Sequence, residues 1–326
     1  MRMMSLTPSK PRLVRYRSCM TFALVALTIA LPACHRKAPP SAGVSARGQE
    51  TFATPEDAGQ TLANAAGNNN QQQMLAIFGP DSKDVIYSGN AAEDKASLAG
   101  FVSAYHRMNR WRKLENGMEI LLVDASNTAF PIPLRKDSSG RWFFDTAAGK
   151  AELTNRSLGR NELAAIDACA ALADAQMEYF SQEHDGAKQY ARKFISGPGK
   201  ENGLYWPQEP GKPKSPLGPL VAFATDEGAK VQPSLHKPFH GYYFGMLTSQ
   251  GFWADGGLRD YVRGGVMNRG FGFIAYPAQY GVSGVMTFVI NQNGVIFQKD
   301  LGEATKDQAP FMTQFNPDSV WSEVRE

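Results

Sequence analysis

Histidine and serine offer the most direct routes to chemistry in this sequence. His236 and His240 have the four-residue spacing of a helical zinc pair, but Pro238 and Gly241 exclude a helix there. Ser283 in "GVSGV" is close to a hydrolase nucleophile motif, yet the second glycine comes one residue early and a strand pattern follows. We therefore predict no metal site, no cofactor and no catalytic residue.

A second group of side chains is typical of a site that binds a ligand. The stretch "HGYYFGML" carries His240, Tyr242 and Tyr243, and Trp206 lies in a Gly- and Pro-rich segment that precedes it. These four residues are our candidate ligand groove, and the alternative is ordinary packing around a hydrogen-bonded histidine. Because side chains alternate across a strand, Tyr242 and Tyr243 face opposite sides, so one of the two is expected in the core.

The first 33 residues predict export. Residues 1–20 hold five basic side chains and no acidic one, and an uncharged apolar run follows over residues 20–31. That run is too short to cross a bilayer as a helix, which takes about 20 residues. A basic segment, a short apolar segment and then small residues are typical of a secretory signal.

The end of this segment, "LPAC", resembles the lipobox of bacterial lipoproteins. The resemblance implies cleavage between Ala33 and Cys34, a diacylglyceryl group on the Cys34 sulfur, and anchoring in the membrane. The alternative is an ordinary secretory signal that is cut nearby. His35 stands where an aspartate would favour the inner membrane, so we expect the periplasmic face of the outer membrane. Residues 34–53 are polar and Pro-bearing, as in a flexible tether.

Removal of the signal changes the charge and the cysteine count. The whole chain has 34 basic and 31 acidic side chains, but residues 34–326 have 29 and 31, a net charge of −2. No basic stripe remains for nucleic acid, which excludes that class of partner. Cys19 leaves with the signal and Cys34 is lipidated, so Cys169 has no partner for an intramolecular disulfide.

The rest of the sequence predicts two α+β lobes. The first, residues 54–157, begins with a helix over 55–66 that Thr54 caps. Further helices are expected near 74–79 and 95–110, then antiparallel strands at 118–123, 129–136 and 140–146. Helices followed by a curved antiparallel sheet resemble the cone-shaped fold of nuclear-transport-factor-like domains.

The second lobe, residues 158–304, combines a long helix starting at Asn161 with an antiparallel meander. Cys169 is expected to be buried and unreactive beside the apolar face of that helix. We predict this face to consist of Leu163, Ile166, Ala170, Ala173, Met177 and Phe180. Strands are expected at 241–247, 270–277, 284–290 and 294–300.

This second arrangement resembles the globular part of type IV pilins and pseudopilins, without the hydrophobic helix half through which pilins polymerise. Residues 305–326 are expected to form a C-terminal tail.

Ordered stretches along nearly the whole mature chain resemble one family of bacterial envelope proteins, named domain of unknown function 2950. They include "FPIPLRKD", "GRWFFDTAAG", "GRNELAAI", "HGYYFGMLTSQG" and "AYPAQYGVSGVMTF". The family is biochemically uncharacterised, so the resemblance implies no catalytic residue. Together these features predict a non-enzymatic envelope protein that binds a peptide or another envelope protein. A periplasmic hydrolase using His240 and a pilus or secretion accessory are the alternatives, and the oligomeric state stays open.

Overall fold

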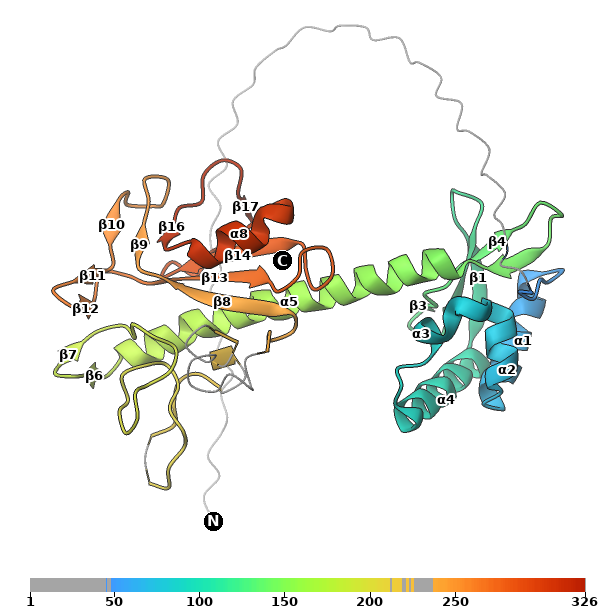
Figure 1. The fold of residues 1–326 in the computed structure, drawn as a ribbon, viewed down its shortest axis with the longest axis horizontal. Helices are drawn as coiled ribbons and strands as arrows, with labels where there is room; N and C mark the ends of the chain where they lie inside the picture. Colours follow the sequence, from blue (N-terminus) through green and yellow to red (C-terminus); the bar gives the residue numbers. More distant parts are fainter. Residues whose placement is uncertain are drawn as a thin grey trace, which may run out of the picture. The chain divides into compact units, whose positions relative to one another are not determined.

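The computed structural model describes residue 45 and residues 48–211, 213–218, 221–222, 224–225 and 237–325. The signal, Ala33, Cys34, most of the tether and His236 lie outside these residues. Within them the protein is a mixed α+β fold with several antiparallel sheets, as predicted (Figure 1).

Asparagine and threonine caps set the starts of the N-terminal helices. Thr54 accepts a hydrogen bond from the Asp57 amide and begins α1 (Pro55–Gly67), as expected. Asn70 and Asn90 cap α2 and α4 in the same way, so both helices begin earlier than the apolar pattern suggested. The bounds are Gln71–Phe78 for α2, Lys83–Ile86 for α3 and Ala91–Arg107 for α4.

The N-terminal sheet has the strand order β1-β2-β4-β5, and β3 also pairs with β2. Its strands are β1 (Asn109–Lys113), β2 (Glu119–Val123), β3 (Thr128–Ala129), β4 (Leu134–Lys136) and β5 (Trp142–Phe144). The expected strand over 129–136 is two short strands because Pro131 and Pro133, which lack an amide donor, lie between them. Leu134 and Phe144 are fully buried between this sheet and the helices.

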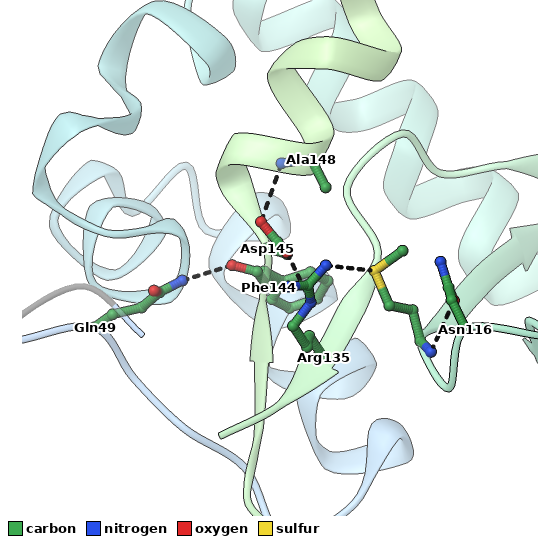
Figure 2. A network of polar contacts seen from close by, with 7 residues as sticks. Gln49, Asn116, Arg135, Phe144, Asp145 and Ala148 are labelled. Atoms are coloured by element: carbon green, nitrogen blue, oxygen red, sulfur yellow. Dashed lines mark hydrogen bonds and ion pairs between the residues drawn. The ribbon is translucent and has the colours of Figure 1, made fainter. Parts of the chain in front are cut away.

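Residues at the start of the described chain are hydrogen-bonded to helix α2 and strand β5. The Gln49 side chain donates to the carbonyl of Ile77 at the end of α2 at 3.0 Å. It also donates to the carbonyl of Phe144 in β5 at 2.8 Å (Figure 2). Phe52 and Trp142 exchange two backbone hydrogen bonds of 2.7 and 2.9 Å. The chain thus pairs with the β5 edge of the sheet before it enters α1.

One helix, α5 (Thr146–Phe180), joins the two sequence regions that we expected as separate lobes. It starts 15 residues before the predicted start at Asn161, because Asp145 accepts a bond from the Ala148 amide and caps it. The helix is continuous through residues 157 and 158. No helix in the described ranges has the length and apolar character needed to cross a bilayer.

The predicted apolar face of this helix is only partly confirmed: Ala173 is buried in the core and Ile166 packs against it, whereas other predicted residues face solvent. Leu163 and Met177 are 65% and 52% exposed. The residues that pack on the C-terminal sheet are mostly small: Ala165, Ala168, Cys169, Leu172, Ala175, Gln176 and Tyr179. These follow the same helical spacing, but they place alanines against the strands, which allows close approach of helix and sheet.

The C-terminal sheet is an antiparallel meander with the order β17-β15-β14-β13-β8, and α5 packs on β13, β14 and β15 (Figure 1). The strands are β8 (Tyr242–Leu247), β13 (Gly272–Pro277), β14 (Met286–Asn291), β15 (Ile296–Asp300) and β17 (Ser322–Glu323). The first four match the predicted strands. Residues 305–325, expected as a tail, contribute β17, a short helix α8 (Thr305–Gln308) and the buried Phe315.

Short hairpins surround this sheet. They are β6 (Glu183–His184) with β7 (Ala187–Lys188), β9 (Ser249–Gln250) with β10 (Arg259–Asp260), and β11 (Val262–Arg263) with β12 (Val266–Met267). A strand from the chain end, β16 (Gln314–Phe315), pairs in parallel with β9.

Cys169 is buried as predicted, which gives a test of the fold. Burial raises the pKa of its thiol to about 12, so almost no reactive thiolate exists near neutral pH. We expect Ellman's reagent at pH 8 to leave the native mature protein unlabelled. In guanidinium chloride it should release one equivalent of thiol, because Cys34 would be a thioether. Rapid native labelling that Cys169→Ser abolishes would contradict this placement.

Candidate functional site

A cleft of 510 Å³ lies where α5 ends. Its walls come from the last turn of α5, the β6–β7 hairpin, the segment after β7, the loop that carries Asn202 and the turn between β11 and β12. The polar side chains that line it are Asp185, Gln189, Arg192, Lys193 and Asn202, together with Tyr179 and Tyr190.

Local geometry holds the β6–β7 hairpin against the helix. The turn residues Asp185 and Gly186 have φ values of 52° and 79°, the left-handed conformation that tight hairpins require. His184 stacks on the ring of Tyr179, with centroids 3.6 Å apart and planes 10° from parallel. Gln189 Nε2 donates to the carbonyl of His184 at 2.7 Å and closes the hairpin from the other side.

The cleft has an excess of cationic groups. Arg192 Nη1 donates to the Gly265 carbonyl at 2.7 Å, which fixes its guanidinium beside the β11–β12 turn and uses one of five donors. Lys193 adds a second cation, and Asp185 is the one carboxylate among the lining residues. This arrangement can bind a carboxylate or another anion through charge-assisted hydrogen bonds.

The tyrosines of the cleft act as neutral hydrogen-bonding groups. Burial, and then the nearby carboxylates of Asp185 and Glu201, raise the pKa of Tyr179 to about 12. Its hydroxyl donates to the Glu201 carbonyl at 3.2 Å. Tyr190 stacks on Phe180 and its pKa is also raised by burial. Near neutral pH both phenols keep their protons, so the tyrosines serve as hydrogen-bonding groups of the cleft and do not act as bases.

The predicted groove residues lie elsewhere. Tyr242 is fully buried, and its hydroxyl donates to the Met286 carbonyl at 2.9 Å. Burial, followed by the charge of Glu162, raises its pKa well above the ordinary tyrosine value. Tyr243 lies on the other face of β8, half-buried, with its ring 6.1 Å from that of Tyr276. The expectation that one tyrosine belongs to the core is confirmed.

Trp206 and His240 have different surroundings from each other. Trp206 belongs to the same core cluster as Tyr242, and its indole N–H donates to the Pro213 carbonyl at 3.1 Å. His240 is exposed, has a φ of 46°, and meets the ring of Phe239 edge-on. The structure therefore joins Trp206 and Tyr242 through the core, and places His240 and Tyr243 outside it.

The remaining chemical candidates have structural roles in the described chain. The Ser283 hydroxyl donates to the Gln279 carbonyl and accepts from the Gln279 amide, as in a turn. Across the described ranges, no three His, Cys, Asp or Glu side chains gather as metal ligands would. His236 lies outside those ranges.

The cationic cleft was missed by sequence reasoning. Its residues come from five segments between Tyr179 and Val266, and only folding brings them together. The one local signal is "ARK", residues 191–193, where two adjacent cations follow the β6–β7 hairpin closely.

Comparison with known proteins places the chain in a family. The family described as Protein of unknown function (DUF2950) has a sequence model that matches residues 49–324. The chain belongs to the DUF2950 family. No curated protein and no solved structure matches it. The nuclear-transport-factor-like and pilin-like resemblances of the two regions therefore stay predictions, while the α+β class of this DUF2950 protein is established.

Two stretches that carried the family resemblance meet where α5 docks on the sheet. In "GRNELAAI", Asn161 donates to the Ser283 carbonyl at 2.9 Å. Glu162 Oε1 accepts from the amides of Val285 and Met286, at 2.9 and 3.1 Å. Ser283, Val285 and Met286 all belong to the second stretch, "YGVSGVMTF". The DUF2950 stretches thus form a polar clamp between the middle of α5 and the start of β14.

Two further stretches meet at the start of α5, as Figure 2 shows. Arg135 of "FPIPLRKD" pairs with Asp145 of "GRWFFDTAAG" at 3.0 Å. The other Asp145 oxygen accepts from the Ala148 amide and caps the helix. Arg135 also reaches the Met118 sulfur at 3.5 Å. In this DUF2950 protein these charged residues therefore orient α5 on the N-terminal sheet.

Proposed function

We propose that this DUF2950 protein is a lipid-anchored envelope protein that binds a peptide carrying a free carboxylate. The observation that carries the proposal is the cleft at the end of α5, which both Arg192 and Lys193 line. Gln189 and Asn202 add amide groups of the kind that hydrogen-bond a peptide backbone, and Asp185 can receive an amino group.

The sequence supports the location. A basic start, a short apolar run and "LPAC" are the features of a lipoprotein signal. Two or more acyl chains provide stable anchoring, whereas one chain gives marginal binding. For the hydrolase alternative, the described contact of His240 is with the ring of Phe239, which offers no acid or base partner.

Neutralising both cleft cations is expected to abolish most peptide binding. We would titrate trialanine with a free carboxylate, and its C-terminal amide, into the full mature chain by calorimetry. The free acid should bind at least about tenfold more tightly, because a charge-assisted hydrogen bond contributes about 1.5–3 kcal/mol. The double variant Arg192→Ala, Lys193→Ala should remove that preference.

Lys306→Ala is the matched control, because Lys306 is an exposed cation on α8 and does not line the cleft. Equal binding of acid and amide, or equal loss in the Lys306 variant, would contradict the assignment of the cleft.

A further inference from the structure

We propose that residues 251–258, the aromatic loop between β9 and β10, insert into the headgroup region of an anionic bilayer. Three large apolar side chains of this loop face solvent: Phe252 is 69% exposed, Trp253 61% and Leu258 73%. The rings of Phe252 and Trp253 meet edge-on with centroids 5.3 Å apart, so they form one continuous apolar tip.

The backbone of the aromatic loop is held in place beneath that tip. Gln250 Nε2 donates to the carbonyls of Asp255 and Gly257, at 2.8 and 2.7 Å. Asn316 accepts from the Trp253 amide at 2.9 Å, while Ala254 is buried under the loop. Because these hydrogen bonds already order the loop, inserting its tip into a bilayer costs little further conformational entropy.

The size of the tip favours a bilayer over a protein partner. Aromatic side chains bury about 150–250 Å² each, so the two rings of the tip, exposed to this extent, offer roughly 260 Å², and Leu258 adds a smaller aliphatic area. A stable protein interface needs about 800 Å² from each partner. A bilayer surface has no such minimum, and tryptophan is enriched at membrane interfaces because its ring is apolar with one polar N–H.

The charges beside the loop fit an anionic surface. Arg259 packs beneath Gly256 of the loop and donates to the Arg269 carbonyl at 3.5 Å. In the sequence, residues 251–270 carry three arginines, Arg259, Arg263 and Arg269, against two carboxylates, Asp255 and Asp260, a net charge of +1. Cations at a surface loop are attracted to anionic headgroups within about one Debye length.

The test uses depth-dependent quenching of tryptophan fluorescence. The full chain is reconstituted into phosphatidylcholine–phosphatidylglycerol vesicles with and without bromine-labelled acyl chains, so the result does not depend on export or acylation in the cell. We expect bromolipid to quench the wild type. In Trp253→Phe, which keeps the apolar bulk, that quenching should fall at least about threefold, because the other four tryptophans lie outside the loop.

A second pair of variants separates the tip from general apolar exposure. Phe252→Ser with Leu258→Ser should reduce the quenching of Trp253, and Phe311→Ser, which removes another exposed phenylalanine, should not. Unchanged quenching in Trp253→Phe would overturn the proposal. So would protection of Trp253 from both bromolipid and aqueous acrylamide, because that result would mean that a protein covers the loop.

Discussion

Cys34→Ser is expected to move the protein from the membrane to the soluble envelope fraction. The serine cannot form the thioether through which the acyl chains are attached, and the apolar run over residues 20–31 is too short to span a bilayer. Fractionation of the native host followed by immunoblotting measures the distribution, and labelling with radioactive palmitate measures acylation. We expect nearly all wild-type protein in the membrane fraction with label.

His35→Ala is the control for this experiment, because it changes the neighbouring residue and keeps the thiol. It should remain acylated and membrane-bound. Retention of the Cys34→Ser protein in the membrane, or a wild type without label, would show that the lipoprotein assignment is wrong.

Gly284→Ala is expected to destabilise the protein by about 3 kcal/mol or more, because overpacking of a filled core forces side chains from their positions. A Cβ atom at Gly284 would lie 2.6 Å from Cε2 of Tyr242 and still closer to its hydroxyl. Tyr242 is fully buried and bonded to Met286, so it cannot move aside freely. Chemical denaturation followed by circular dichroism measures the change in the free energy of unfolding.

Two variants make this result specific. Gly159→Ala, in the interior of α5, has no atom within 4 Å of the added Cβ and should stabilise the protein by up to about 1 kcal/mol. Adding Tyr242→Phe to Gly284→Ala removes the hydroxyl and should recover part of the loss. If the two glycine variants were equally stable, the close packing of β8 against residue 284 would be disproved.

Strand positions were predictable where short apolar runs are bounded by turn residues. β8, β13, β14 and β15 all appear near their expected places; β13 and β14 are buried along nearly their whole length, with side chains in the core clusters on both sides of the sheet. The strand β1, "NRWRK", was missed because it is an edge strand whose polar residues face solvent and only Trp111 packs inward.

The face of α5 was partly mispredicted, for a different reason. The predicted face included Ala173, which is in the core, but it also took in the exposed Leu163 and Met177 and missed Ala165, Ala168 and Cys169. A search that scored small residues as core would have found the correct face. The cleft could not have been found in this way, since Asp185, Arg192 and Gly265 become neighbours only through tertiary structure.

The bonds at Gln49 and Phe52 have a mechanical consequence. In the lipid-anchored protein that we propose, a chain held at Cys34 would transmit any pull from the membrane to the first residues that are fixed in the fold. There the load is shared between the Ile77 and Phe144 carbonyls and the two backbone bonds with Trp142. Several hydrogen bonds to two elements must therefore break before tension reaches α1, which protects the N-terminal core against forced unfolding.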